Sequence, residues 1–319
     1  MKNKILVTGG TGFLGRNLVK KLSEDKSNLI TILDNNSRKS AKKENIKGKF
    51  NNIKYISGDI LNFDTVNAAC SGIDTIFHLA YINGTKFFYS MPDKIFKVAV
   101  YGMINLINSA KNKKIKNFIL ASSSEVYQNP NKIPTPENIE LKIPDINNPR
   151  YSYGGGKIFC ELMLLYYGKK YFNRSIIFRP HNVYGPNMGR EHVIPEFINK
   201  IEKAKRSKIK KITIEGKGKE TRSFIYIDDF IDALNLIYKK GKKNNIYNIG
   251  TKEEISIINL LKILQKKMGT NFKIKHKPIK KGGTSKRCPD IKKISELGFK
   301  KKYSLSSGLD QTIDWYRTS

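Results

Sequence analysis

Cysteine is scarce in this chain of 319 residues, which contains only Cys70, Cys160 and Cys288. An odd number of cysteines without metal-ligand spacing argues against a disulfide framework and favours a reducing compartment, so we expect a cytoplasmic protein. Long apolar runs are also missing, and none approaches the roughly 20 residues that a membrane-spanning helix needs. The N-terminal residues enter a strand-like pattern that does not resemble a signal peptide, so we expect no membrane partner.

Acidic residues are outnumbered, because 27 Asp and Glu against 60 Lys and Arg give a formal net charge of +33. Such a balance ordinarily suggests nucleic acid or an anionic surface as a partner. Only ten of the basic residues are Arg, however, and the lysines are spread along the whole chain. We therefore expect solvated lysines, no nucleic-acid partner, and a positive field that attracts an anionic substrate.

Short apolar runs alternate with helix-like segments through the first part of the chain. The candidate strands cover residues 4–8, 29–34, 53–57, 74–79, 117–122 and 175–180. The candidate helices cover residues 13–25, 63–71, 93–111 and 151–172. This alternation predicts an α/β fold with a doubly wound parallel (Rossmann) sheet, because parallel strands require helical crossovers.

A glycine-rich turn, Gly9-Gly10-Thr11-Gly12-Phe13-Leu14-Gly15, follows the first candidate strand and opens the first candidate helix. Such a turn lets backbone N–H groups approach a pyrophosphate at the positive end of a helix. Asp34 ends the second candidate strand, about 20 residues past the last glycine, where a carboxylate binds ribose hydroxyls and repels a 2′-phosphate. The turn and the acid together predict NAD, and not NADP, as the cofactor.

The pattern changes after residue 180, where Pro and Gly interrupt a less regular stretch. A helix at 228–240 and a strand near 246–249 are expected to rejoin the sheet. We therefore predict a discontinuous NAD-binding domain, residues 1–180 with approximately 226–250. Residues 181–225 and 251–319 then form a smaller, irregular substrate lobe.

Tyr153 and Lys157 are four residues apart at the start of a candidate helix, so they share one helix face. A phenol titrates near pH ~10, and a neighbouring cation lowers its pKa toward neutrality, where the phenolate can act as a general base. The cluster Ser122-Ser123-Ser124-Glu125 ends the fifth candidate strand, at the edge where parallel sheets bind ligands. A serine hydroxyl there can share a hydrogen bond with the substrate oxygen that Tyr153 deprotonates.

Together these motifs resemble the extended short-chain dehydrogenase/reductase family, specifically its NAD-dependent nucleotide-sugar epimerases, decarboxylases and dehydratases. The resemblance runs through nearly the whole chain. It also rests on five further segments: Asp59-Ile60, His78-Leu79-Ala80, Arg179-Pro180-His181-Asn182-Val183-Tyr184-Gly185-Pro186, Glu220-Thr221-Arg222-Ser223-Phe224 and Lys286-Arg287-Cys288-Pro289-Asp290-Ile291.

The resemblance implies a role for each matching residue. The implied cofactor contacts are Gly9, Gly12, Phe13, Leu14, Gly15, Asp34, Asn35, Asp59, Ile60, Leu79, Ala80, Lys157 and Pro180. The implied substrate contacts are Ser124, Asn182, Arg222 and Arg287, of which the last three would hold the nucleotide diphosphate. In catalysis, Tyr153 would take the proton of the sugar 4-hydroxyl as a hydride leaves C4 for NAD. Lys157 would hold the nicotinamide ribose and keep Tyr153 ionised, and Ser123 would hydrogen-bond the same sugar oxygen.

The fate of the resulting 4-keto sugar separates three activities. Dehydratases of the family place Asp-Glu where this chain has Ser124-Glu125, so elimination lacks its acid. The Ser-Glu pair and the Thr-Arg-Ser-Phe segment resemble UDP-glucuronate decarboxylases, in which Arg222 and Glu125 would lie beside the carboxylate. A 4-epimerase needs no further acid or base, because the keto sugar only turns over and takes the hydride back. We favour the epimerase, with the decarboxylase as the alternative; a reductase of a non-nucleotide alcohol is more distant, because it has no use for Arg222 and Arg287.

Three further features complete the expectations. The family usually has Asn at the position of Ala99, a residue tied to the cofactor pocket and proton relay, which a water could replace. The helix at 151–172 is apolar over more than one face, so we expect it to form a homodimer together with the helix at 93–111. The four histidines are scattered, so we expect no metal site.

Overall fold

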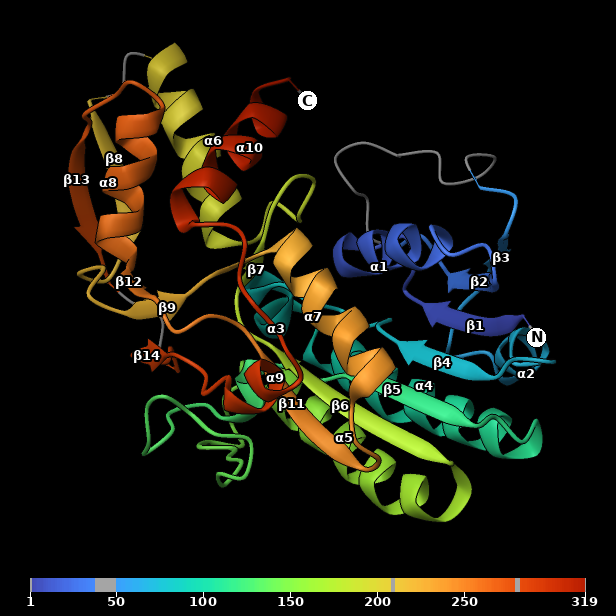
Figure 1. Ribbon diagram of the computed structural model, residues 1–319. Helices are drawn as coiled ribbons and strands as arrows, with labels where there is room; N and C mark the ends of the chain where they lie inside the picture. Colours follow the sequence, from blue (N-terminus) through green and yellow to red (C-terminus); the bar gives the residue numbers. More distant parts are fainter. Residues whose placement is uncertain (1, 38–49, 208–209, 279–281, 319) are drawn as a thin grey trace.

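Seven parallel strands form the central sheet of the computed structural model, which describes residues 2–37, 50–207, 210–278 and 282–318. The strands are β1 (Asn3–Thr8), β2 (Asn28–Asp34), β3 (Ile53–Ser57), β4 (Thr75–His78), β5 (Asn117–Ala121), β6 (Arg174–Pro180) and β11 (Asn245–Ile249). Their order across the sheet is β11-β6-β5-β4-β1-β2-β3, so the direction of winding reverses between β1 and β4 (Figure 1). The predicted doubly wound parallel sheet is confirmed, and a ligand crevice is expected at this reversal.

Helices cover both faces of the sheet. Helices α1 (Phe13–Ser23) and α7 (Ile227–Lys240) lie on one face, and α2 (Phe63–Ala69), α4 (Pro92–Asn112) and α5 (Tyr151–Tyr171) lie on the other (Figure 1). Neighbouring strand residues alternate between the two cores, because Ile5 and Val7 pack under α1 and α7 while Leu6 packs under α4. Burial on both faces explains why the strands are almost continuously apolar.

The smaller lobe is built from helices and short sheets that the chain forms before and after its return to the central sheet. Its helices are α6 (Val193–Arg206), α8 (Ile257–Lys267), α9 (Lys292–Glu296) and α10 (Leu305–Thr318). Its strands are β7 (Val183–Tyr184) with β10 (Ile225–Tyr226), β8 (Lys211–Glu215) with β13 (Lys273–Lys277), and β9 (Thr221–Ser223) with β12 (Glu254–Ser256) and β14 (Lys286–Arg287). The expected helix and strand that rejoin the sheet are α7 and β11, the latter paired with β6.

Membrane-spanning helices and metal-binding clusters are both absent from the described part of the chain. No helix in it is both long enough and apolar enough to cross a membrane. No group of three or more His, Cys, Asp or Glu side chains in it could hold a metal ion. The three cysteines are free and buried.

Candidate active site

A cleft of about 1030 Å³ lies at the carboxyl ends of the sheet strands and reaches into the smaller lobe. Every residue that the sequence assigned to catalysis, cofactor or substrate lines this one cleft. These residues are Gly9, Gly12, Phe13, Leu14, Gly15, Asp34, Asn35, Asp59, Ile60, Leu79, Ala80, Ser123, Ser124, Glu125, Tyr153, Lys157, Pro180, Asn182, Arg222 and Arg287. The fold therefore brings together segments that lie far apart along the chain.

The glycine-rich turn leaves no room for side chains beside the start of α1. Gly9 has a φ of +71°, and a Cβ on it would lie 2.7 Å from the Ala80 Cα. A Cβ on Gly15 would overlap the carbonyl oxygen of Gly9, so α1 packs directly against the turn. Gly12 is the N-cap of α1 and supplies no side-chain cap, so the N–H groups of the first helical turn remain available to an anion. This backbone cradle fits a pyrophosphate.

Two carboxylates stand at the end of the cleft formed by β2 and β3. Asp34 accepts hydrogen bonds from the backbone N–H of Thr11 at 2.9 Å and of Asn36 at 2.8 Å. Asp59 accepts one from the Asn35 side-chain amide, also at 2.9 Å. These bonds connect the loop after β2 to the glycine-rich turn and to the loop after β3. A pair of oriented carboxylates can accept hydrogen bonds from ribose hydroxyls and disfavours a 2′-phosphate, so these residues fit NAD.

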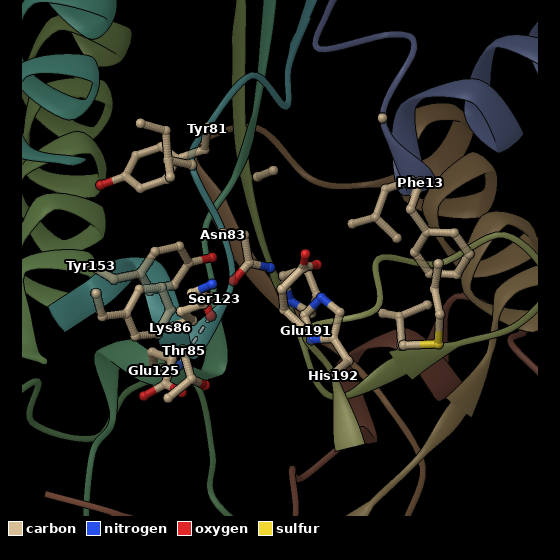
Figure 2. A pocket seen from close by; sticks show the side chains of 18 of the residues that line it. Phe13, Tyr81, Asn83, Thr85, Lys86, Ser123, Glu125, Tyr153, Glu191 and His192 are labelled. Carbon is tan, nitrogen blue, oxygen red and sulfur yellow. Dashed lines mark hydrogen bonds between the residues drawn. The ribbon is translucent and has the colours of Figure 1, made fainter. Parts of the chain in front are cut away.

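Tyr153 and Lys157 face the cleft from the first turns of α5. The Tyr153 side chain is 5% exposed, and its ring stacks on Phe88 of α3 (Thr85–Ser90) with centroids 4.6 Å apart. The Lys157 Nζ donates to the carbonyl oxygen of Ala121 at 2.7 Å, at the end of β5. Burial lowers the pKa of Lys157 to about 8. Figure 2 shows Tyr153 on one side of the cleft and Phe13 across from it.

The chain turns sharply after β5 into a short 3₁₀ helix, η1 (Ser124–Val126). Ser123 is its N-cap, and the Ser123 Oγ accepts the backbone N–H of Glu125 at 3.1 Å. Because this oxygen acts as an acceptor there, the Ser123 hydroxyl hydrogen is left to donate into the cleft. Ser123 is thus oriented by its own turn and lines the same cleft as Tyr153 and Lys157.

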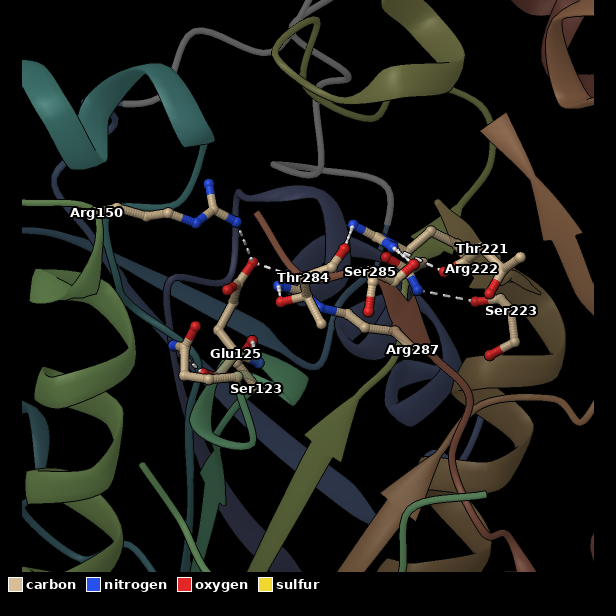
Figure 3. A network of polar contacts seen from close by, with 11 residues as sticks. Ser123, Glu125, Arg150, Thr221, Arg222, Ser223, Thr284, Ser285 and Arg287 are labelled. Atoms are coloured by element: carbon tan, nitrogen blue, oxygen red, sulfur yellow. Dashed lines mark hydrogen bonds and ion pairs between the residues drawn. The ribbon is translucent and has the colours of Figure 1, made fainter. Parts of the chain in front are cut away.

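Glu125 lies between two arginines (Figure 3). One Glu125 carboxylate oxygen is 2.7 Å from Arg287 Nη1 and 3.5 Å from Arg150 Nη2. Burial alone would raise the pKa of Glu125, but the charges of Arg287 and then Arg150 outweigh burial and hold that pKa below its ordinary value. Glu125 is therefore a carboxylate and not a proton donor near neutral pH.

Arg222 completes a positively charged cluster on the smaller-lobe side of the cleft. Strand β9 carries Arg222 and pairs with β14 so that Arg222 stands opposite Arg287. The Arg222 guanidinium donates to the backbone oxygens of Thr221 at 2.7 Å and Thr284 at 2.8 Å. Burial and then repulsion from Arg287 lower the pKa of Arg222 to about 9. Three arginines around one carboxylate leave positive charge for an anionic ligand.

A buried ion pair fixes the elements beneath the cleft. Arg179 of β6 binds Glu161 of α5 through Nε to Oε1 at 2.8 Å and Nη2 to Oε2 at 2.5 Å. The Ser122 hydroxyl also donates to Glu161, and Arg179 Nη1 donates to the Tyr127 hydroxyl at 2.7 Å. The carboxyl ends of β5 and β6 are thereby joined to the middle of α5, which fixes Ser123 relative to Tyr153 and Lys157.

Some cleft residues gave no signal in the sequence. Arg150 directly precedes α5 and belongs to no motif, and only the fold shows that it contacts Glu125. Tyr81 and Phe88 are ordinary aromatic residues in the sequence, yet both pack on Tyr153. The residues that the sequence predicted belong to short motifs. The contacts of Arg150, Tyr81 and Phe88 arise only when distant segments pack together.

Comparisons with known proteins agree with this geometry. The family model described as "NAD dependent epimerase/dehydratase family" matches residues 5–250. The chain is 30% identical to the human dTDP-D-glucose 4,6-dehydratase, covering 98% of this chain and 90% of that protein. It is 31% identical to UDP-glucuronic acid decarboxylase 4 of Arabidopsis thaliana, covering 98% and 68%. The structure of the UDP-glucuronic acid 4-epimerase from Bacillus cereus, in complex with UDP-glucuronic acid and NAD, is similar with a TM-score of 0.88, 27% identity, and coverage of 99% of each chain.

Proposed function

Because the chain belongs to the NAD-dependent epimerase/dehydratase family, we propose that it is a nucleotide-sugar 4-epimerase acting through a 4-keto sugar. One observation argues against dehydration among the family's reactions. Glu125 is held as a carboxylate by Arg287 and Arg150, so it has no proton to give to a departing water. Epimerisation needs no acid of this kind, since the proton removed from the 4-oxygen is the one returned.

Three side chains would act at or near the 4-oxygen of the sugar. NAD, when bound, supplies the acceptor for the hydride of C4 and later its donor. The Tyr153 phenolate takes the proton of the sugar 4-hydroxyl and gives it back, and the Ser123 hydroxyl donates to the same oxygen. Lys157 keeps a positive charge beside Tyr153, which stabilises the phenolate. The carboxylate of Glu125 orients Arg287 in this scheme.

The remaining cleft residues would bind the cofactor and the nucleotide sugar. Gly9, Gly12, Phe13, Leu14 and Gly15 would hold the cofactor pyrophosphate, and Asp34, Asn35, Asp59 and Ile60 its adenosine. Leu79, Ala80, Pro180 and Lys157 would lie against its nicotinamide half. Ser124, Asn182, Arg222 and Arg287 would bind the nucleotide sugar. All of these line the same cleft.

A UDP-glucuronate decarboxylase is the second candidate. The guanidinium groups of Arg222 and Arg287 lie beside Glu125 and could bind a sugar carboxylate in place of a phosphate oxygen. A 4-keto uronate is a β-keto acid and loses CO₂ readily, and the C5 enolate that remains then takes a proton from solvent. Only the product separates this reaction from epimerisation.

The test is incubation of the pure protein with UDP-, GDP-, CDP- and dTDP-sugars, including uronates, followed by mass spectrometry and NMR. We expect a product of unchanged mass with inverted C4, absent with the Tyr153→Phe variant. A product that has lost CO₂ replaces this proposal with the decarboxylase. A product that has lost water, or no conversion of any sugar by a protein that binds NAD, rejects both.

We also propose a cytoplasmic homodimer that buries the outer face of α4 and α5. Large apolar side chains are exposed on that face, with Tyr101 at 57%, Leu162 at 48% and Tyr166 at 71%. Sedimentation at micromolar concentration should give the mass of two chains, and Tyr166→Asp should shift it to one. A wild-type monomer would reject the dimer and leave the enzymatic proposal intact.

A further inference from the structure

Tyr81, in the loop after β4, fills a space that two small residues leave between α4 and α5. A Cβ on Gly156 of α5 would overlap the Tyr81 hydroxyl oxygen and lie 2.9 Å from the Cβ of Ala99 on α4. The Tyr81 hydroxyl therefore occupies the place of a side chain at position 156. Figure 2 shows this hydroxyl directed away from the cleft. The large side chain of Tyr81 thus fits the space left by the small residues Ala99 and Gly156, and we call these three residues the matched set.

The ring of Tyr81 contacts both members of the catalytic pair. The Lys157 Nζ lies 3.7 Å from the centroid of the Tyr81 ring, within the range of a strong cation–π contact. The ring also meets Tyr153 edge to face, with centroids 5.2 Å apart and an interplanar angle of 86°. The Tyr81 hydroxyl, by contrast, is buried without a hydrogen-bond partner among the described residues. The ring face is thus the part of Tyr81 that can act on Lys157.

We propose that Tyr81 is a positioning residue for Lys157, whose ammonium it holds beside Tyr153 with the face of its ring. The inference rests on the proposed function, in which charged Lys157 binds the nicotinamide ribose and supports the Tyr153 phenolate. Lys157 donates to the Ala121 carbonyl at 2.7 Å on one side and meets the Tyr81 ring on another. Removing the ring would leave a buried ammonium with less to stabilise its charge.

Other titratable groups near Lys157 are accounted for. They are His78 on β4, Cys160 and Glu161 on α5, and the two tyrosines Tyr81 and Tyr153. Burial lowers the pKa of His78 to about 3 and raises that of Cys160 to about 11, so both are neutral between pH 6 and pH 9. Burial also raises the pKa of Tyr81 well above 10. Glu161 is paired with Arg179. An experiment on pH dependence must therefore distinguish the titration of Lys157 from that of Tyr153.

The experiment measures the NAD dissociation constant from pH 6 to pH 9.5 with the full chain, so no sugar substrate is needed. All variants carry Tyr153→Phe, which removes the phenol as a titrating group and keeps its ring. Since burial lowers the pKa of Lys157 to about 8, NAD should bind more weakly as pH rises through that value. Tyr81→Leu should move this midpoint down by about one pH unit, while Tyr81→Phe should leave it in place.

The Lys157→Met variant distinguishes failure of this inference from failure of the proposed function. If Lys157→Met removes the pH dependence and Tyr81→Leu leaves its midpoint unchanged, Tyr81 does not position Lys157. If Lys157→Met retains the pH dependence, Lys157 does not meet the cofactor as a cation, and the proposed function loses the charge that supports the Tyr153 phenolate. Thermal unfolding of each variant checks that it is folded at the assay temperature.

Gly156→Ala and Tyr81→Phe together test the matched set, because both keep an aromatic ring at position 81. Gly156→Ala should weaken NAD binding about tenfold, because its methyl group displaces Tyr81 from Lys157. In a Tyr81→Phe background the overlapping oxygen is gone, so the loss should be markedly smaller. Gly155→Ala is the matched control, since its Cβ would lie 3.3 Å from Ile143 and approaches no part of Tyr81. Equal losses from Gly156→Ala in both backgrounds would contradict the proposal.

Discussion

The two ends of the cleft are assembled differently. At the cofactor end, the backbone of a single turn, residues 9–15, forms the cradle beside α1. At the other end, where we propose that the nucleotide sugar binds and which we call the sugar end, charged side chains meet from segments far apart in the chain: Glu125, Arg150, Arg222 and Arg287. Few substitutions in a backbone cradle would leave cofactor binding intact. In a side-chain cluster, by contrast, single substitutions can change which ligand is bound. The family's shared cofactor and its several reactions are consistent with this division.

The largest effect is expected at Tyr153, where the two ends meet. Tyr153→Phe keeps the ring that stacks on Phe88 but removes the phenol oxygen, so turnover should fall by about 10²-fold or more. NAD affinity, measured by fluorescence titration, should change little. Tyr151→Phe is the control, because Tyr151 lies on the same helix without a lysine four residues later. Near-normal turnover of Tyr153→Phe would show that Tyr153 is not the general base.

The next effect should be confined to the sugar end. Arg222→Gln removes a partly buried charge, so KM for the nucleotide sugar should rise on the order of 30-fold while the NAD dissociation constant stays unchanged. Arg206→Gln, an exposed arginine at the end of α6, serves as the control for net charge. Equal weakening of sugar and NAD would show that the two ends are not separable in this way.

A reciprocal effect is expected at the cofactor end. Asp34→Ala should weaken NAD about tenfold and narrow its advantage over NADP, because the carboxylate that repels a 2′-phosphate is gone. Binding of both dinucleotides is measured by titration, with the exposed Asp64→Ala as the control. An unchanged ratio of the two affinities would refute the role of Asp34.

The smallest effect concerns two buried histidines, His78 and His181. His78 bonds Thr8 at 2.8 Å, His181 bonds Asn248 at 3.2 Å, and burial lowers the pKa of each imidazole to about 3. Both stay neutral in the folded protein, whereas the unfolded chain takes up protons below pH ~6.5. The stability they contribute is thus present above that pH and lost as pH falls from ~6.5 toward 3. Each should remove about 1 kcal/mol of unfolding free energy between pH 7 and pH 5.5.

Urea unfolding at the two pH values measures this loss. His181→Gln should lower stability at pH 7 but make the protein less sensitive to acidification, since one titrating group has been removed. If the variant loses as much free energy on acidification as the wild type, His181 is not the neutral buried group described here.

Sequence reasoning predicted the local motifs of the cleft better than its long-range contacts, for a physical reason. The glycine-rich turn, Asp34 and the Tyr153–Lys157 pair are patterns of neighbouring residues, and the strand periodicity of the sheet is local too. The contact of Arg150 with Glu125 and of Tyr81 with Lys157 exists only after distant segments pack. Short strands of the smaller lobe, such as the two-residue β7, are too brief to show any period.

The central claim is that the C4 hydrogen leaves and returns within one closed cycle, with Tyr153 moving the only proton. The most direct test runs the reaction on a converted nucleotide sugar in D₂O and locates deuterium in the product by NMR. The account predicts a C4 epimer with no deuterium on any carbon, because the hydrogen at C4 never exchanges with solvent. Deuterium at a ring or methyl carbon, together with loss of CO₂ or water, would contradict it.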